Sequence, residues 1–152
     1  MNKIIDLSQP IEDTMPVYPK DLKTNLAQIK YLNRDKYNNH RLEISMHSGT
    51  HIDSQMHLTD FKHYISELPL EPFIAEGCVL DVRDQLKIGY KDEYDTLIKE
   101  NSIVLFYTGY DVYYGFKEYY ENHPHIDIEL CKLLIAKNIK MVGMDTPSQE
   151  KT

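Results

Sequence analysis

Three histidines and one aspartate lie within a single eleven-residue segment of this 152-residue chain. They are His47, His51, Asp53 and His57, and all four occupy odd positions. Side chains two residues apart project from the same face of an extended strand. The even positions nearby carry apolar residues, namely Ile44, Met46, Ile52, Met56 and Leu58. This alternation predicts a strand with one apolar face and one face of imidazole and carboxylate groups.

An α-helix would not bring these four side chains together. At 100° per residue, Asp53 would point about 160° away from His51, and Ser48-Gly49-Thr50 has poor helix propensity. A straight strand over residues 47–57 would span roughly 33 Å, which is too long for one site. We therefore expect the segment to bend at Gly49, as a bulge or tight turn.

Imidazole nitrogen and carboxylate oxygen without a thiolate suit Zn²⁺, Mn²⁺ or Fe²⁺, and the residue types do not choose among these ions. In a strand, His51 and Asp53 would lie about 6.6 Å apart on one face, so that both can reach one ion. The segment therefore predicts a metal-dependent hydrolase. The remaining histidines are expected to be ordinary surface or core residues: His40, His63, His123 and His125.

Composition limits the class of protein. The length suits one domain with a sizeable core, and 41% hydrophobic with 27% charged residues is typical of a globular protein. The net charge of −7 argues against a nucleic-acid or anionic-membrane partner. No apolar run reaches the length of a membrane helix, and the first residues do not resemble a secretory signal. Cys78 and Cys131 are expected to be reduced, buried thiols of a cytoplasmic protein.

Hydrophobic patterns predict an α/β domain with a mixed sheet. Strands are expected over residues 4–8, 26–32, 41–46, 78–82, 102–107 and 139–144, with a proline-punctuated loop over 9–20. Helices are expected over 90–100, 110–121 and 127–138, the last capped by Asp127. The tyrosines between 107 and 120 are expected to cover a helix face or a subunit contact. Tyr107 and Tyr110 are the candidates for substrate contact, because they follow a strand.

The motif His47-x-Gly49-Thr50-His51-x-Asp53-x-x-x-His57 closely resembles the signature of the metal-dependent cyclase/kynurenine formamidase (arylformamidase) family. The similarity extends over essentially the whole chain. It includes residues 6–19, 76–82, 108–110, 123–124 and 142–148, in the family's order.

The resemblance implies a swivelling β/β/α-type fold, one domain over residues 1–152 and a homodimer or homotetramer. It also implies hydrolysis of a small amide. The type substrate would be N-formylkynurenine, cleaved to kynurenine and formate in tryptophan catabolism, and related members open cyclic amides such as isatin.

By the same resemblance, His47, His51 and Asp53 would bind one or two divalent ions, with zinc the foremost candidate. Asp53 could bridge two ions, and His57 would be the general acid and base. Asp145, Tyr18 and Tyr110 are candidates for supporting a ligand or lining the pocket. A turn-forming role for Asp145 before Thr146-Pro147 is an equal alternative.

Two features depart from the family pattern. Gln55 stands where the family usually has a proline, which would fix the turn that aims His57. Family members also continue beyond the point that corresponds to Thr152, with a further histidine and a glutamate for the metal centre. We therefore expect a C-terminally truncated member. The alternative function is a truncated or degenerate member that binds metal or ligand weakly without catalysis. A metallo-β-lactamase relative is disfavoured, because its His-x-His-x-Asp-His order is absent.

Overall fold

The structure is a computed structural model that describes residues 3–148. It divides into two compact units, an N-terminal unit (Met1–Tyr64) and a C-terminal unit (Ile65–Thr152). Both antiparallel and parallel pairing occur, together with α-helices, so the predicted α/β class is confirmed. The boundaries of the single predicted domain stay a prediction.

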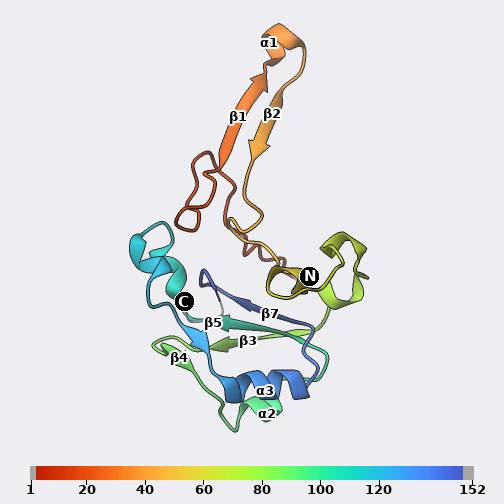
Figure 1. Cartoon of the computed structure of the whole chain (residues 1–152), viewed down its shortest axis with the longest axis vertical. Helices are drawn as coiled ribbons and strands as arrows, with labels where there is room; N and C mark the ends of the chain where they lie inside the picture. Colours follow the sequence, from red (N-terminus) through yellow and green to blue (C-terminus); the bar gives the residue numbers. More distant parts are fainter. Residues whose placement is uncertain (1–2, 149–152) are drawn as a thin grey trace. The chain divides into compact units, whose positions relative to one another are not determined.

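The N-terminal unit contains one β-hairpin (Figure 1). Strand β1 (Asn25–Lys30) pairs antiparallel with β2 (Asn39–Glu43), and a one-turn helix α1 (Leu32–Asp35) forms part of the connection. The two predicted strands of this region are therefore confirmed in their main part. The second strand ends at Glu43, before the histidine segment begins.

The short first strand predicted over residues 4–8 is wrong. These residues have no ladder partner and are exposed in the structure. A side-chain carboxylate takes the place of a strand partner, because Asp6 Oδ1 accepts a hydrogen bond from the Ser8 N–H at 2.9 Å. Such Asx turns compete with strand pairing for backbone donors.

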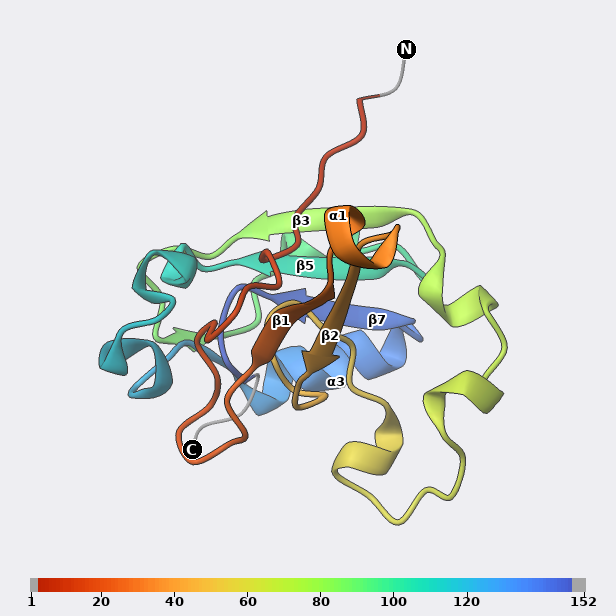
Figure 2. The ribbon, with the colours of Figure 1, turned by 90° about the horizontal axis from the view of Figure 1, so that it is seen from above.

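A parallel three-stranded sheet forms the centre of the C-terminal unit (Figure 2). Its strands are β3 (Gly77–Asp81), β5 (Ile103–Tyr107) and β7 (Met141–Met144), in the order β3-β5-β7. All three were predicted from short apolar runs, and all three are confirmed. Their carboxyl ends meet at one edge of the sheet, where ligands bind in many open α/β folds.

Helices α2 (Tyr94–Leu97) and α3 (Ile128–Ala136) cover one face of this sheet (Figure 1). The capping prediction is confirmed, because Asp127 Oδ1 accepts a hydrogen bond from the Leu130 N–H at 2.9 Å. Helix and sheet share one core, which comprises Leu80, Val82, Ile88, Tyr94, Ile98, Val104, Phe106, Leu130 and Leu134. Within residues 3–148 no helix has the length and apolar character needed to cross a membrane.

Two helix predictions are wrong in extent. Residues 90–100 form only the single turn of α2, and residues 110–121 form two 3₁₀ turns, η4 (Tyr110–Tyr113) and η5 (Lys117–Tyr120). Gly115 separates these turns with a φ of +89°, which an α-helix cannot accommodate. The sequence also gave no sign of the two-residue strands β4 (Lys87–Ile88) and β6 (His125–Ile126), which pair in parallel.

Candidate metal centre

The histidine segment belongs to the N-terminal unit and is a turn and not a strand. Residues 46–50 form turns and bends, and Gly49 has a φ of +61°, so the predicted bend occurs at the predicted residue. The predicted regular strand is wrong, because no ladder partner extends beyond Glu43. The predicted apolar face also fails, since Met46 is 78% exposed and Leu58 is 67% exposed. Reversal of the chain, and not alternation along a strand, brings the polar side chains together.

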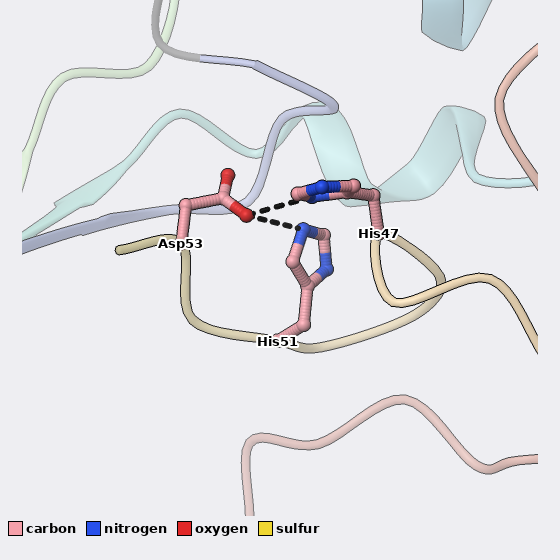
Figure 3. A group of neighbouring side chains, drawn as sticks. All are labelled: His47, His51 and Asp53. Atoms are coloured by element: carbon pink, nitrogen blue, oxygen red, sulfur yellow. Dashed lines mark ion pairs between the residues drawn. The ribbon is translucent and has the colours of Figure 1, made fainter. Parts of the chain in front are cut away.

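Three of the four predicted side chains converge (Figure 3). His47, His51 and Asp53 each present one ligand atom, and these atoms lie within 4.8 Å of one another. His47 Nδ1 lies 2.7 Å from Asp53 Oδ1, and His51 Nε2 lies 3.4 Å from the same oxygen. One carboxylate oxygen therefore faces both imidazoles.

A backbone carbonyl determines which ring nitrogen of His51 faces the cluster. His51 Nδ1 lies 2.9 Å from the carbonyl oxygen of Gly49. A carbonyl can only accept, so Nδ1 carries a proton, and Nε2 is the ring nitrogen that remains available to Asp53 or to an ion. Nε2 lies 3.4 Å from the Asp53 oxygen. Either a proton on Nε2 or a metal ion bound to both atoms would make this contact favourable.

The donor set fits a divalent ion. Two ligands at about 2.1 Å from a tetrahedral zinc ion lie about 3.4 Å apart, which is the separation of His51 Nε2 and Asp53 Oδ1. The 2.7 Å separation of His47 Nδ1 and Asp53 Oδ1 is that of a hydrogen bond. A bound ion would displace the proton between these two atoms and increase their separation. Metal-binding histidines usually donate their other ring N–H to a carbonyl or carboxylate, which orients the ring. The Gly49 carbonyl has this position relative to His51. The side chains are 28–45% exposed, so a small molecule can approach them.

His57 lies beside the cluster without joining it. It ends the 3₁₀ turn η1 (Gln55–His57), and its ring centroid is 3.9 Å from that of His47, with the planes inclined at 38°. It is not among the three residues whose ligand atoms converge. The arrangement suits the predicted division between ion ligands and a separate proton carrier, and both roles stay predictions.

Gln55 begins the turn that places His57. Its carbonyl accepts hydrogen bonds from the N–H of Leu58 at 3.3 Å and from the N–H and hydroxyl of Thr59 at 3.0 and 2.7 Å. The preceding Ser54 is extended, with φ −89° and ψ 167°. This backbone is the one that a following proline would demand. Hydrogen bonds from Leu58 and Thr59 thus hold a turn that a proline ring could also stabilise.

Two contacts hold the bend around Gly49, and neither is evident from the sequence. A Cβ atom on Gly49 would lie 2.8 Å from the Cε of Met15, which is buried with 6% exposure. The Thr50 hydroxyl accepts a hydrogen bond from the Gln9 N–H at 2.9 Å. The proline-punctuated segment before β1 therefore contacts the histidine turn at two points. The only sequence signal for this was the resemblance of residues 6–19 to the family's opening.

Asp145 belongs to the C-terminal unit and uses its carboxylate locally. Its oxygens accept hydrogen bonds from the Thr108 N–H at 2.9 Å, the Thr108 hydroxyl at 2.6 Å and the Gly109 N–H at 2.8 Å. These bonds tie the residues after β7 to the residues after β5. A role in supporting a metal ligand stays a prediction for this residue.

The two tyrosine candidates also have local partners. The Tyr110 hydroxyl lies 2.8 Å from the carbonyl oxygen of Glu118 and 2.9 Å from that of Glu121, and burial raises its pKa. Its ring packs against Tyr113 and Tyr119, as expected for a tyrosine cluster with a packing role. Tyr18 is 37% exposed, and its carbonyl accepts from the Asp21 N–H at 3.0 Å. Neither residue's predicted role at a pocket is tested by these contacts.

A charged pair at the end of β3 was not anticipated. Arg83 donates to both oxygens of Asp81, at 2.9 Å from Nε and 2.7 Å from Nη2, and its guanidinium lies 5.2 Å from the ring centroid of Tyr107. Side-chain hydrogen bonds from Arg83 lower the pKa of Asp81. A lone Arg two residues after an Asp gives no distinctive pattern in a sequence, so this pair could be found only in three dimensions.

Comparison with known proteins identifies the family. The sequence profile of the Cyclase family, described as "Putative cyclase", matches residues 5–151. The chain belongs to this family. A kynurenine formamidase of Geobacillus thermodenitrificans is 29% identical over 150 residues, which are 97% of this chain and 70% of that protein. A kynurenine formamidase of Bacillus cereus is 25% identical over 146 residues, which are 95% of this chain and 68% of that protein.

Solved structures share the fold. A structure described as a "Potential Metal-Dependent Hydrolase With Cyclase Activity" superposes with a TM-score of 0.76 at 24% identity, covering 99% of this chain and 71% of that one. An isatin hydrolase bound to the product analogue thioisatinate gives a TM-score of 0.81 at 17% identity, covering 96% of this chain and 68% of that one. At these identities the likeness establishes the cyclase-type fold.

Proposed function

We propose that this chain is a metal-dependent amidohydrolase of the arylformamidase type, which cleaves N-formylkynurenine to kynurenine and formate. The observation that carries the proposal is the convergence of His47, His51 and Asp53, in which one oxygen of Asp53 faces a ring nitrogen of each histidine. The kynurenine formamidases that match most of the chain supply the substrate class.

His47, His51 and Asp53 would hold the ion, with zinc the first candidate and manganese or iron as alternatives. A divalent ion lowers the pKa of a water that it binds from 15.7 toward about 7 and polarises a carbonyl oxygen. The chain's own contribution is orientation. The Gly49 carbonyl keeps His51 in the Nδ1–H form, and Asp53 faces both imidazoles.

His57 would move the proton. In hydrolysis a new C–O bond forms, the C–N bond breaks, and the nitrogen of the departing amine must gain a proton. Histidine exchanges protons near neutral pH, so one imidazole can accept the proton of the attacking water and return it to the amine. The ring of His57 lies against that of His47, which would place this proton carrier beside the ion without occupying one of its ligand positions.

The test combines elemental analysis with a hydrolysis assay. The purified chain is loaded separately with Zn²⁺, Mn²⁺ and Fe²⁺, and each form is assayed with N-formylkynurenine and, for comparison, with isatin. We expect at least one bound ion per chain and formation of kynurenine that is lost on chelation and restored by the ion. An Asp53→Asn variant, which keeps the size of the side chain, should lose both properties.

The second candidate is a degenerate family member that binds an ion without catalysis. It is favoured by the small number of converging ligands, which is three among residues 3–148. A chain that retains its ion but hydrolyses neither amide would establish this second function and overturn the first.

A further inference from the structure

Met15 is the one buried apolar side chain among residues 3–64 of the N-terminal unit, with 6% exposure. Its terminal methyl group packs on Gly49 so closely that a Cβ atom on the glycine would lie 2.8 Å from it. Gly49 is two residues from His47 and two residues from His51 in the sequence. The buried apolar contact of this unit is therefore made at the bend that carries two of the candidate ligands.

The backbone is left-handed both at Gly49 and directly before Met15. Gly49 has a φ of +61°, which a glycine adopts without strain. Thr14 has a φ of +59°, which is rare for a β-branched residue. Its N–H donates to the carbonyl of Thr24 at 3.0 Å, and the Met15 N–H donates to the carbonyl of Glu12 at 3.3 Å. Strained backbone of this kind persists only where surrounding contacts impose it, and it is concentrated at functional sites.

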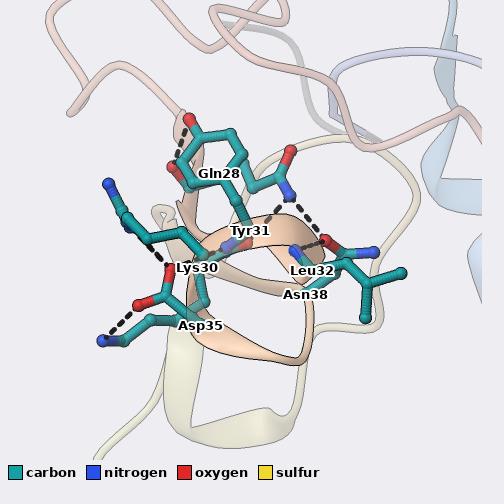
Figure 4. A network of polar contacts seen from close by, with 7 residues as sticks. Gln28, Lys30, Tyr31, Leu32, Asp35 and Asn38 are labelled. Atoms are coloured by element: carbon teal, nitrogen blue, oxygen red, sulfur yellow. Dashed lines mark hydrogen bonds and ion pairs between the residues drawn. The ribbon is translucent and has the colours of Figure 1, made fainter.

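Another turn of the same unit is held by polar side chains instead (Figure 4). At the hairpin tip (residues 31–38), Asp35 accepts a hydrogen bond from the Tyr31 N–H at 2.9 Å. Asn38 Oδ1 accepts one from the Leu32 N–H, also at 2.9 Å. These side chains bind the backbone of the tip directly. At the histidine turn the corresponding contact is apolar packing, which constrains the backbone only while the space is filled.

The backbone of Gly49 in turn orients a candidate ligand. Its carbonyl oxygen lies 2.9 Å from His51 Nδ1, so that Nε2 of the same ring faces Asp53. Loss of an outer contact that orients a metal-binding histidine typically lowers metal affinity by about 10- to 100-fold. Because Met15 packs on the residue that supplies this carbonyl, its side chain can act on the ion through the ring of His51.

We propose that Met15 is a positioning residue of the metal centre. Its side chain fixes the bend at Gly49, and through the Gly49 carbonyl it holds His51 in the orientation that binds the ion. Met15 is assigned no contact with the ion or with substrate. The inference rests on the proposed function for the role of the site, whereas the packing of Met15 and the orientation of His51 belong to the metal-free chain.

The first measurement is zinc affinity by calorimetry. Met15→Ala removes the packing on Gly49, and Met15→Leu keeps an apolar side chain of similar volume. Met46→Ala is the matched control, because Met46 is 78% exposed although it directly precedes His47. We expect the dissociation constant to rise by about 10- to 100-fold in Met15→Ala. Met15→Leu should largely restore the wild-type affinity, and Met46→Ala should leave it unchanged.

The second measurement needs no metal. A two-bond ¹H–¹⁵N correlation of the histidine rings, recorded where they are neutral, reports which nitrogen of His51 carries the proton. In the wild type and in Met15→Leu the proton should be on Nδ1, whereas Met15→Ala should also populate the form with the proton on Nε2. A general loss of stability would not move this proton while the unit stays folded. Unchanged amide signals of the β1–β2 hairpin, which belongs to the same unit, show that it does.

The two measurements separate this proposal from that of the metal-dependent hydrolase. A His51 proton that stays on Nδ1 in folded Met15→Ala would overturn the positioning role, as would equal losses of zinc affinity in Met15→Ala and Met46→Ala. A wild-type chain that binds no zinc, with a His51 ring that still responds to Met15→Ala, would overturn the metal function and support the positioning role. If Met15→Ala does not fold, Met15→Val is measured in the same way, because it removes less of the side chain but still lacks the methyl group that contacts Gly49.

Discussion

The two units of the chain are stabilised by different kinds of interaction. In the C-terminal unit, nine side chains of a continuous apolar core lie between a parallel sheet and its helices. In the N-terminal unit, the buried residues among positions 3–64 are Met15, Thr24 and Ser48, and the candidate ligands lie on a turn at the surface. Hydrophobic burial therefore determines the structure of the C-terminal unit, whereas turns and hydrogen bonds determine that of the N-terminal unit. Mutations in the C-terminal core should therefore lower the stability of the chain, whereas mutations in the N-terminal turn should change metal binding or turnover.

The largest separation is expected for His57→Ala. This change removes the proposed proton carrier and leaves all three converging ligand atoms in place. Turnover of N-formylkynurenine should fall by about 10²- to 10⁴-fold, which is the usual contribution of general acid–base catalysis. Metal content per chain should stay at the wild-type value. Loss of metal in the same proportion as turnover would show that His57 is itself a ligand.

Leu130→Ala should lower the stability of the chain without a direct effect on the metal ligands. Leu130 is fully buried between α3 and the sheet. Truncating such a residue costs about 2–5 kcal/mol of the free energy of unfolding, measured by denaturant titration. Ile135→Ala is the control, because Ile135 lies on the same helix and is 78% exposed. A loss in the control as large as in Leu130→Ala would contradict the assignment of the core.

Gly49→Ala should weaken the metal centre through the backbone. A left-handed conformation costs a residue with a Cβ about 1–2 kcal/mol, and this Cβ would also press on Met15. The affinity for the ion should fall by about 5- to 30-fold, the factor that corresponds to this energy. Titration with Zn²⁺ measures it, and Gly77→Ala in β3 is a control remote in sequence with an ordinary φ. Equal affinities in wild type and Gly49→Ala would mean that the bend does not position the ligands.

The smallest effect is expected for Gln55→Pro, which restores the family's usual residue. Ser54 is already extended, so the proline ring fits without a change in the preceding backbone. Loss of unfolded-state entropy should raise the free energy of unfolding by about 0.4–1 kcal/mol. A destabilised variant would show that the Gln55 N–H or its side chain makes a contact that this turn requires.

The sequence predicted the C-terminal unit better than the N-terminal one, for a physical reason. The strand Ile103–Tyr107 and the helix cap at Asp127 are determined by residues close together in the sequence. A short apolar run indicates a buried strand, and an aspartate before a helix indicates a hydrogen bond at the helix terminus. The turn over residues 47–57 depends instead on contacts distant in sequence, such as the Gln9 N–H on the Thr50 hydroxyl. Alternation of residue types suggested a strand there, although the bend at Gly49 was correctly placed.

The candidate site shows the same division. Chemistry and spacing predicted a site of four residues, and the resemblance to the family distinguished the three that converge from His57. The ring nitrogen of His51 that faces the cluster could not be predicted, because it depends on a backbone carbonyl brought beside Nδ1 by the turn. The supporting Met15 and the charged pair of Asp81 and Arg83 also required three-dimensional information, since none of them carries a periodic signal.

The most direct test of the metal centre is a zinc titration of the wild-type chain beside His51→Ala and His40→Ala, monitored by calorimetry. His40 lies exposed on β2, in the same unit but outside the converging group, so its loss serves as the matched control. We expect the wild type and His40→Ala to bind the ion with equal affinity, and His51→Ala to bind it much more weakly or not at all. Unchanged binding in His51→Ala, or an absence of binding in the wild type, would contradict it.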